Sequence, residues 1–491
     1  MKLSQLSHPS ILILGLGREG QSTWRFLRAA FPEKILGAAD RLPLGELPPE
    51  AAALLRNDSR AQLHLGPDYL TCLADYDVIV KTPGIPVTLP EYRRALAAGQ
   101  RITSQTDLFF SNASGTIIGV TGTKGKSTTA SLIHSILSRS GQKAFLVGNI
   151  GAPALDLLPQ GLPPAVDDLV SKGNRRDSAF DLESQTRGDT VFVYELSSHQ
   201  LEGLRQSPPI AVLLNVVPEH LDYYESFEQY VAAKENITRY QTAPDWLVYD
   251  CDHAIPREIA SRSPARRVAC SLDRLSVPGC AVVGEWIACS LEEGQREEIM
   301  AVRDVPLPGR FNLLNVAAAV AVGKILGVKT TEIAAAVRGF QPLEHRLERV
   351  GTFGGITYYN DSIATVPEAT MAALDTLGED VETILLGGTD RHLDFSALAK
   401  RLLQSRIQTV ILFPPTGERI WRAVCEQDPE AASRFRHFSA ASMEEAVAWA
   451  RKHTAAGKIC LHSPASPSFG LFRDYRDRGE QFKRLVSEPR P

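Results

Sequence analysis

Short apolar runs recur along the chain, and longer segments with helical periodicity separate them. The runs occupy 10–14, 78–81, 117–120 and 143–147, and two more end at Glu195 and near Asn215. Each run has the length and composition of a buried strand. After 117–120, Leu132, Ile133, Ile136 and Leu137 fall on one helical face, and Gly141 ends that helix as a C-cap. Strands alternating with helices predict an α/β fold with parallel sheets, whose carboxyl edges carry ligand-binding loops.

The turn between the run at 117–120 and its helix is rich in glycine and lysine. Its residues are Gly122, Thr123, Lys124, Gly125, Lys126, Ser127 and Thr128. Backbone N–H groups at such a helix start can cradle phosphate, Lys126 can reach the outer phosphates, and Ser127 can ligate magnesium. The Walker spacing requires a glycine at 120, where this chain has Val120, so a plain glycine-rich turn is the alternative. The context of strand, loop and helix favours a nucleotide-triphosphate site.

A second glycine-rich turn follows the first apolar run. Gly15, Gly17 and Gly20 have the GxGxxG spacing, and Asp40 falls where the next strand should end. One interpretation is a dinucleotide site with Asp40 on a ribose, but the same turn binds any diphosphate or only allows close packing. Another tight turn, Thr82, Pro83 and Gly84, follows the run at 78–81 and either lines the same crevice or is a plain loop.

Oxygen-rich side chains follow the central strands. Ser127, Glu195 and His220 would meet at one sheet edge, and this donor set suits a magnesium ion held between protein and triphosphate oxygens. A lone histidine is more often a surface or core residue, but His220 directly follows a buried strand and has acidic neighbours. Lys234 lies on an expected helix, where a solvated lysine is the ordinary case.

Length and composition bound the remaining possibilities. A chain of 491 residues allows about three domains. The net charge of −4 and dispersed basic residues disfavour nucleic acid. No apolar run reaches a membrane span and no signal peptide is recognised, so we expect a cytoplasmic protein without a membrane partner. The seven scattered cysteines are expected to be reduced thiols. The polar, aperiodic segment 160–189 is expected to be a surface loop or insertion.

Several motifs, in order and spacing throughout the chain, resemble the Mur ligases, and most closely the branch that adds glutamate to UDP-N-acetylmuramoyl-L-alanine. They are TGTKGKSTT, GNIG, ELSSHQL, NVVPEHLDYYESFEQYVAAKENI, LPGRFNLLNVAAA, EHRLERV, NDSIAT and SPASPSFGLFRDYRDRG. The resemblance implies a Rossmann-like UDP-substrate domain (1–113), a central P-loop ATPase domain with a parallel sheet (114–342) and a Rossmann-like glutamate domain (343–491). It also implies the use of ATP and Mg²⁺. We expect a monomer, although the sequence does not determine the oligomeric state.

The resemblance assigns a role to each matching residue. It implies catalytic roles for Lys126, Lys234 and His220, and magnesium ligation by Ser127, Glu195, His220 and a carbamylated Lys234. It implies ATP contacts from Gly122 to Thr128 and from Asn312, Arg346 and Asp361. The UDP-substrate contacts would be Gly15, Gly17, Arg18, Gly20, Asp40, Thr82, Pro83, Gly84, Asn149 and Ser197. The glutamate contacts would be Thr365, Arg391, Ser468 and Tyr475.

Four positions depart from the family pattern. Ile363 replaces the lysine of NDSKAT, and Phe311 replaces the histidine of GxHN. Tyr475 stands for the more familiar phenylalanine, and Arg391 for a lysine. The first change affects the amino-acid pocket, and relatives that use L-glutamate also lack that lysine.

The implied chemistry is ATP-dependent amide ligation, in which a carboxylate becomes an acyl phosphate and an amine then displaces the phosphate. D-glutamate is the expected amino acid and L-glutamate the alternative. A folylpolyglutamate-type ligase would share the phosphate loop but is expected to lack the diphosphate turn. A dinucleotide-dependent oxidoreductase would explain that turn but not Lys126, Glu195 and His220.

Overall fold

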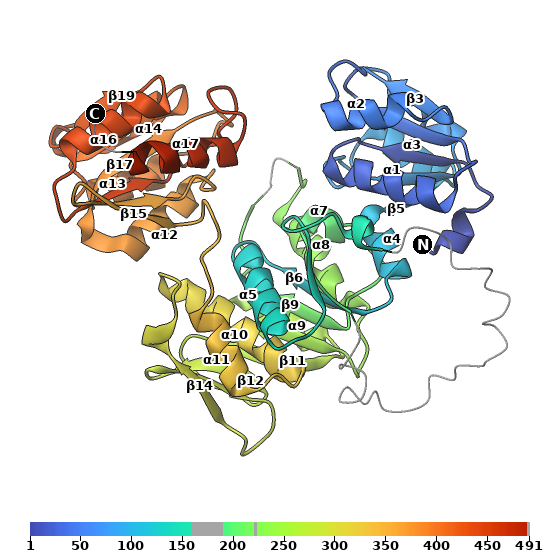
Figure 1. Ribbon diagram of the computed structural model, residues 1–491, viewed down its shortest axis with the longest axis horizontal. Helices are drawn as coiled ribbons and strands as arrows, with labels where there is room; N and C mark the ends of the chain where they lie inside the picture. The colour runs from blue at the N-terminus through green and yellow to red at the C-terminus, as the bar shows by residue number, and fades with distance from the viewer. Residues whose placement is uncertain (159–189, 220–222, 489–491) are drawn as a thin grey trace. The chain divides into compact units, whose positions relative to one another are not determined.

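The computed structural model describes residues 1–158, 190–219 and 223–488 (Figure 1). Two compact units are present: residues 1–304 with 313–339, and residues 305–312 with 340–491. The described strands form three sheets. The expected insertion at 160–189 and the candidate ligand His220 lie outside the described residues. The three predicted domain ranges stay predictions.

The first sheet is parallel, with strand order β3-β2-β1-β4-β5. Its strands are β1 (Ile11–Leu14), β2 (Leu36–Asp40), β3 (Ala61–Leu65), β4 (Val78–Lys81) and β5 (Arg101–Ser104). Its α-helices are α1 (Arg18–Ala30), α2 (Pro49–Arg56), α3 (Pro90–Ala97) and α4 (Gln105–Asn112). The order reverses at β1, so the turn after β1 lies at the topological switch point, where such sheets bind ligands.

The second sheet has the order β14-β13-β12-β11-β10-β9-β6-β8-β7. Its strands are β6 (Thr116–Thr121), β7 (Ala144–Gly148), β8 (Val191–Glu195), β9 (Ile210–Leu213), β10 (Trp246–Asp250), β11 (Arg266–Ser271), β12 (Gly279–Val283), β13 (Trp286–Ser290) and β14 (Glu297–Ala301). Its α-helices are α5 (Lys126–Arg139), α7 (Ser198–Leu201), α8 (Phe227–Arg239), α9 (Ala254–Arg262), α10 (Arg310–Ile325) and α11 (Thr330–Arg338). The sheet is parallel from β7 to β12, as expected, but β13 and β14 pair antiparallel, so the sheet is mixed.

The first two sheets share one hydrophobic core. Phe109 of α4 packs edge-on against Tyr194 of β8, with ring centroids 5.5 Å apart, and both side chains are fully buried. Helix α4, which follows the last strand of the first sheet, therefore packs directly on the second sheet.

The third sheet has the order β15-β16-β20-β17-β18-β19 and is parallel except for the β15–β16 pair. Its strands are β15 (Glu348–Phe353), β16 (Ile356–Asn360), β17 (Val381–Gly387), β18 (Thr409–Phe413), β19 (Arg436–Ser439) and β20 (Ile459–His462). Its α-helices are α12 (Pro367–Leu377), α13 (Ser396–Leu403), α14 (Thr416–Gln427), α15 (Pro429–Ala432), α16 (Met443–His453) and α17 (Tyr475–Ser487). Because β16, β20 and β17 are neighbours, the loops that follow them leave the same sheet edge.

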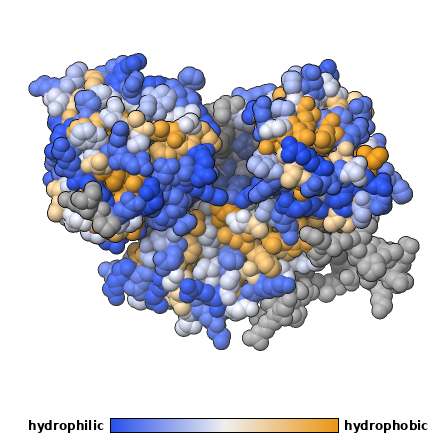
Figure 2. Space-filling model, turned by 45° about the horizontal axis from the view of Figure 1, so that its top comes forward, coloured by the Kyte–Doolittle hydropathy of each residue, from blue (hydrophilic) through white to orange (hydrophobic). Residues whose placement is uncertain are grey.

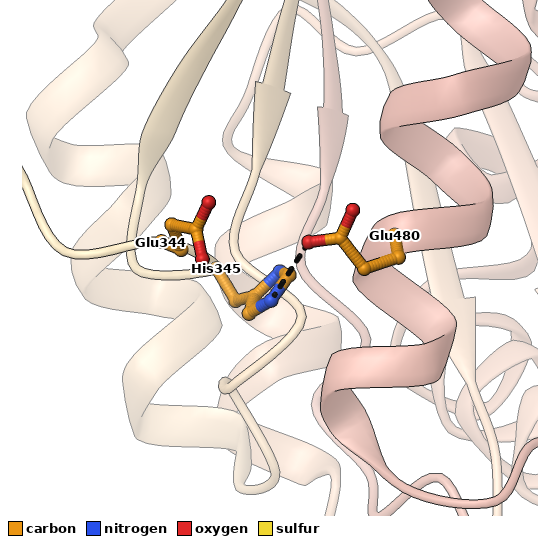
Figure 3. Close-up of side chains that lie close together, drawn as sticks. All are labelled: Glu344, His345 and Glu480. Carbon is orange, nitrogen blue, oxygen red and sulfur yellow. Dashed lines mark ion pairs between the residues drawn. The ribbon is translucent and has the colours of Figure 1, made fainter. Parts of the chain in front are cut away.

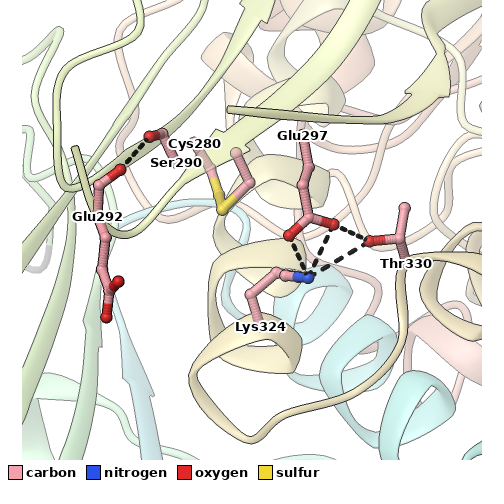
Figure 4. Close-up of a disulfide and its surroundings, with 7 residues drawn as sticks. Cys280, Ser290, Glu292, Glu297, Lys324 and Thr330 are labelled. Atoms are coloured by element: carbon pink, nitrogen blue, oxygen red, sulfur yellow. Dashed lines mark hydrogen bonds and ion pairs between the residues drawn. A yellow bond between two sulfur atoms is a disulfide. The ribbon is translucent and has the colours of Figure 1, made fainter. Parts of the chain in front are cut away.

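Cys280 and Cys289 form a disulfide, so the expectation that all cysteines are reduced was wrong for this pair (Figure 4). The two residues face each other directly in the β12–β13 hairpin, with Cα atoms 4.1 Å apart. Counting and spacing cysteines does not reveal such a cross-strand pair, because it depends on the hairpin register.

No described helix combines the length and the apolar composition that a membrane span requires. Figure 2 shows hydrophilic and hydrophobic residues intermixed on the face that it presents. Large exposed apolar side chains, such as Ile35, Leu96 and Phe469, come from separate parts of the chain. Single exposed apolar residues are ordinary on a protein surface.

Candidate active site

The glycine-lysine turn connects β6 to α5. Gly125 is the N-cap of α5, has a left-handed φ of 85°, and provides no side chain to cap the helix. A Cβ there would lie only 2.3 Å from Oδ1 of Asn315, so close packing also requires glycine. The first N–H groups of α5 are consequently left without a side-chain cap and can receive phosphate.

Val120, where the Walker pattern has glycine, is a fully buried residue within β6. It pairs with Glu195 of β8 and Val212 of β9. The tight turn starts only at Gly122, which has a φ of 154°. The departure from the Walker spacing is therefore accommodated because the strand extends through position 120.

Lys126 and Lys234 converge on one carbonyl of this loop. The ammonium of Lys126 donates to the carbonyls of Gly122 at 3.1 Å and Thr123 at 2.9 Å, and that of Lys234 donates to Gly122 at 2.8 Å. Lys234 is 1% exposed, so it is not the solvated lysine that its helical position would ordinarily suggest. Helix α8 brings it from a remote part of the sequence to the phosphate loop.

Burial lowers the pKa of Lys234 well below the ordinary lysine value, and the positive charge of Lys126 lowers it further. Glu219 and Glu195 act in the opposite direction but are weaker causes. The neutral amine is thereby favoured at this position. A neutral lysine amine is a nucleophile, whereas the ammonium is not.

The carboxylate of Glu195 ends β8 beside the same loop. It is 3% exposed, and its Oε2 has no hydrogen-bond partner among the described residues. Ser127, in the first turn of α5, is also buried. An unpartnered carboxylate oxygen and a hydroxyl next to a phosphate-binding turn fit a magnesium ion, which prefers oxygen ligands.

Thr123 and Tyr230 fix the loop, and sequence reasoning missed both roles. The Thr123 hydroxyl lies 2.9 Å from the Tyr230 hydroxyl and 3.0 Å from the Val217 carbonyl. The Lys234 nitrogen lies 4.7 Å from the centre of the Tyr230 ring. The four-residue spacing of Tyr230 and Lys234 places them on one helical face, which is the signal that could have identified the tyrosine.

The three glycines of the first turn differ in their surroundings. A Cβ on Gly15 would lie 2.2 Å from Oγ1 of Thr82, and one on Gly20 would lie 1.9 Å from the Gly15 carbonyl. Packing alone explains these two. Gly17 has a φ of −64°, and a Cβ there would meet no atom within 4 Å. Neither packing nor a positive φ requires glycine at 17; the residue is the N-cap of α1, a position where glycine is favoured, and a ligand that approaches this turn would also favour it.

Asp40 and Thr82 hold this turn from both sides. The Asp40 carboxylate accepts the N–H groups of Leu16 at 2.8 Å and Leu42 at 3.0 Å. The Thr82 hydroxyl donates to the Leu14 carbonyl at 3.1 Å. Pro83 and Gly84 continue the loop after β4 and are partly or fully exposed.

Residues predicted to bind the UDP-linked substrate come together from both sheets of the first unit. Arg18 donates to the carbonyls of Gly148 at 2.6 Å and Asn149 at 3.3 Å. Ser197 is the N-cap of α7, and Gln200 of that helix donates to Glu19 of α1 at 2.8 Å. These bonds join the glycine-rich turn after β1 and the start of α1 to the segments after β7 and β8.

The predicted nucleotide contacts Arg346 and Asp361 lie in the second unit. Asp361 accepts the N–H of Leu347 at 3.0 Å and the hydroxyl of Ser463 at 2.7 Å, and burial raises its pKa to about 6. Asn312 is buried and donates to the Pro308 carbonyl at 2.6 Å. Arg346 directly precedes Leu347.

The predicted glutamate contacts follow β16, β17 and β20. Thr365 is half-buried, Arg391 is exposed, Ser468 is 3% exposed, and Tyr475 begins α17. Hydrogen bonds connect their loops: the N–H of Thr389 donates to the Pro467 carbonyl at 2.8 Å. Ile363 is half-buried, and its N–H donates to the His345 carbonyl at 3.1 Å.

Comparison with known families matches three consecutive parts of the chain. Residues 9–104 match the Mur ligase MurD-like N-terminal domain, residues 120–323 the Mur ligase middle domain, and residues 345–466 the Mur ligase glutamate ligase domain. A protein of Symbiobacterium thermophilum named UDP-N-acetylmuramoylalanine–D-glutamate ligase is 35% identical, over 96% of this chain and 97% of its own. The chain is a MurD-like member of the Mur ligase family.

A second relative and two solved structures are also similar to this chain. A protein of Acidobacterium capsulatum with the same name is 32% identical over 98% of this chain and 97% of its own. The solved structure of MurC from Thermotoga maritima has a TM-score of 0.55 at 18% identity and covers 98% of both chains. MurF from Acinetobacter baumannii has a TM-score of 0.56 at 15% identity, covering 83% of this chain and 85% of its own. The two structures show that the Mur ligase fold is shared.

Among the residues that the structure describes, Glu344, His345 and Glu480 form a further group of potential metal ligands in this Mur ligase (Figure 3). The two carboxylates of this group already pair with a lysine, because the Lys483 ammonium lies 3.1 Å from Glu344 and 3.2 Å from Glu480. The same ammonium lies 3.2 Å from Glu348. The group is therefore an ion-pair network that attaches α17 to the segment before β15.

Gly17→Ala tests the diphosphate turn of this Mur ligase. The added methyl group meets no protein atom, but alanine is a poorer N-cap of α1 than glycine, so we expect only a small decrease in the melting temperature. It would project toward the approaching ligand, so the apparent KM for the UDP-linked substrate is expected to rise by about tenfold or more. Gly20→Ala is the contrasting variant, since its methyl group would overlap the Gly15 carbonyl and lower the melting temperature. An unaltered KM in Gly17→Ala would contradict a ligand at this position.

Proposed function

We propose that this Mur ligase uses ATP to join glutamate to UDP-N-acetylmuramoyl-L-alanine, releasing ADP and phosphate. The observation that carries the proposal is similarity over almost the whole chain to proteins named for this activity. The position of Lys126 at the phosphate loop supports it, since ligation through a phosphorylated carboxylate needs positive charge there, and the buried Glu195 and Lys234 lie beside the same loop.

The first step of the proposed reaction joins two anions. The alanyl carboxylate attacks the γ-phosphorus of ATP, and the bond to the leaving ADP oxygen breaks. Lys126 neutralises charge on the phosphates, and the N–H groups at the start of α5 orient them. A magnesium ion held by Ser127, Glu195, His220 and a carbamate on Lys234 would supply further positive charge at the phosphates.

The second step forms the amide. The neutral amine of glutamate attacks the acyl phosphate carbon, and the tetrahedral intermediate expels phosphate. The ligands must therefore be held by three sets of residues. The first unit would bind the UDP moiety through Gly15, Gly17, Arg18, Asp40, Thr82 and Asn149 and the triphosphate through the loop, and the second unit would bind the incoming amino acid.

The cellular setting follows from these substrates. ATP and UDP-linked sugars are cytoplasmic metabolites, so we place the reaction in the cytoplasm, in the assembly of peptidoglycan precursors. We further propose that the enzyme acts as a monomer.

D-glutamate is the amino acid that we propose, because the full-length relatives are named D-glutamate ligases. One observation favours the alternative, L-glutamate: Ile363 removes a lysine from the expected pocket. Phosphate release by the purified enzyme with ATP, UDP-N-acetylmuramoyl-L-alanine and either enantiomer decides between them. Turnover with D-glutamate supports the proposal, and turnover with L-glutamate alone would replace it.

Arg391→Ala tests how the pocket holds glutamate without that lysine. Arg391 is permanently charged and can bind a carboxylate through two parallel hydrogen bonds, so we propose that it anchors the side-chain carboxylate. The variant is expected to raise the apparent KM for glutamate by about tenfold or more, with little change for ATP. Arg391→Lys should recover part of the loss, and Arg422→Ala, an exposed arginine of the same domain, should change neither value. A glutamate KM that stays at the wild-type value would refute this role.

A further inference from the structure

Arg478 of α17 is a completely buried arginine whose direct partners are neutral. Its Nε donates to the Ser362 hydroxyl at 3.0 Å, Nη2 to the Ser362 carbonyl at 2.8 Å, and Nη1 to the Ser466 carbonyl at 3.1 Å. Removing a guanidinium from water without a hydrogen-bonded carboxylate has a large free-energy cost. Burial lowers the pKa of Arg478 to about 9, and the nearby Asp361 partly opposes that shift. Such a costly arrangement calls for a function.

The guanidinium lies where three loops meet. It bonds directly to the loop after β16, through Ser362, and to the loop after β20, through Ser466. The loop after β17 lies beside it, because a Cβ on Gly388 would lie 3.1 Å from Nη1 of Arg478, and the N–H of Thr389 in that loop donates to the Pro467 carbonyl of the loop after β20 at 2.8 Å. The five N–H donors of arginine form a planar fork that can hold several carbonyls at once, which the single ammonium of lysine does not reproduce.

These three loops carry the residues proposed to bind glutamate. Thr365 belongs to the first loop, Arg391 to the second and Ser468 to the third. Tyr475 lies one helical turn before Arg478 on α17, and its carbonyl accepts the Ser362 hydroxyl at 2.7 Å. Ser362 therefore connects the guanidinium to the backbone of Tyr475 as well.

Ion pairs further along α17 also hold this helix in place. Lys483 forms ion pairs with Glu344, Glu348 and Glu480, and His345 lies 3.5 Å from Glu480 (Figure 3). Arg478 thus projects from this helix and adds hydrogen bonds that join the loops after β16 and β20.

We propose that Arg478 is a positioning residue that holds the three loops after β16, β17 and β20 in the arrangement needed to bind the incoming amino acid. This inference rests on the proposed function. Loss of the guanidinium would let the pocket residues separate, and displacements of about 1 Å are enough to reduce the efficiency of a bound reaction by about a hundredfold. The glycine-lysine loop at 122–128 and the turn with Gly15, Gly17 and Gly20 lie in the other unit and would keep their geometry.

The test compares Arg478→Met and Arg478→Lys with wild type in steady-state phosphate release. We expect the apparent KM for glutamate to rise by about tenfold to a hundredfold in both variants, and that for UDP-N-acetylmuramoyl-L-alanine to change less than about twofold. Ser362→Ala removes the hydroxyl between Arg478 and Tyr475 and makes a milder change. It should raise the same constant by a smaller factor, and it serves as the decisive variant if Arg478→Met does not fold.

Arg451→Met is the matched control. Arg451 of α16 donates to backbone carbonyls at the C-terminal end of α17, Leu485 at 2.7 Å and the C-cap residue Glu488 at 2.6 Å. Its loss should lower the melting temperature without changing the KM for glutamate. The proposal is overturned if Ser362→Ala and the Arg478 variants keep the wild-type glutamate KM, or if Arg451→Met raises it equally. Wild-type enzyme without glutamate-dependent phosphate release would instead contradict the proposed function, so the two failures are distinguishable.

Discussion

Replacement of Lys126 by alanine is expected to abolish ATP-dependent turnover while the protein stays folded. The side chain donates to two loop carbonyls, and losing such bonds from a half-buried position costs about 1 kcal/mol of stability. The same ammonium would stabilise charge on the transferred phosphoryl group, and loss of such a group typically slows turnover by about 10²- to 10³-fold or more. The rate effect should therefore far exceed the effect on the melting temperature.

Phosphate release and thermal unfolding of the same preparation measure the two effects of Lys126→Ala. Lys143→Ala is the control, because Lys143 is an exposed lysine of the same domain, outside the proposed site. It should match wild type in both measurements. A Lys126→Ala enzyme that retains wild-type turnover would remove the phosphate loop from the mechanism.

Replacement of Lys234 by alanine is expected to reduce ATP-dependent turnover by a comparable factor. Its buried amine lies 2.8 Å from the Gly122 carbonyl, and its lowered pKa favours the neutral form. A neutral amine can attack the carbon of CO₂, lose a proton and become a carbamate, which exchanges a cation for an anion at the phosphate loop. Without this negative charge, turnover is expected to fall by about 10²-fold or more.

Rescue distinguishes the carbamate from a structural role of Lys234. A short carboxylic acid can enter the space left in Lys234→Ala and supply a carboxylate, so partial recovery of phosphate release is expected with added acetate or formate. Lys234→Arg fills the space with a permanent cation and should remain inactive under the same conditions. A Lys234→Ala enzyme as active as wild type would exclude the role, and ¹³C NMR of wild-type enzyme in ¹³CO₂ should show the carbamate directly.

The sequence was sufficient to predict the elements that carry the phosphate loop. The strand predicted at 117–120 lies within β6, and the turn from Gly122 to Gly125 lies between β6 and α5 as expected. These features are local, because apolar runs, glycines and helical periodicity determine them within a few residues. Lys234 could be singled out only by family resemblance, since its spacing is that of any helical lysine.

Features that depend on long-range packing were not predicted. The disulfide between Cys280 and Cys289 depends on the register of the β12–β13 hairpin, and the antiparallel β13 and β14 depend on how the edge of the sheet is completed. Arg478 donates to Ser362, which lies 116 positions earlier in the chain, and to Ser466, which lies 12 positions earlier. A pattern of side-chain types contains no information on which distant loop a buried arginine will meet.

The most direct test of the account follows oxygen atoms through the reaction. UDP-N-acetylmuramoyl-L-alanine labelled with ¹⁸O in the alanyl carboxylate is incubated with enzyme, ATP, Mg²⁺ and glutamate, and the released phosphate is analysed by mass spectrometry. If the carboxylate attacks ATP and the amine then displaces phosphate, one ¹⁸O atom moves from each substrate molecule that reacts into the phosphate. The account predicts labelled phosphate in equal amount to the UDP-N-acetylmuramoyl-L-alanyl-glutamate formed. Unlabelled phosphate, or phosphate release without this product, would contradict it.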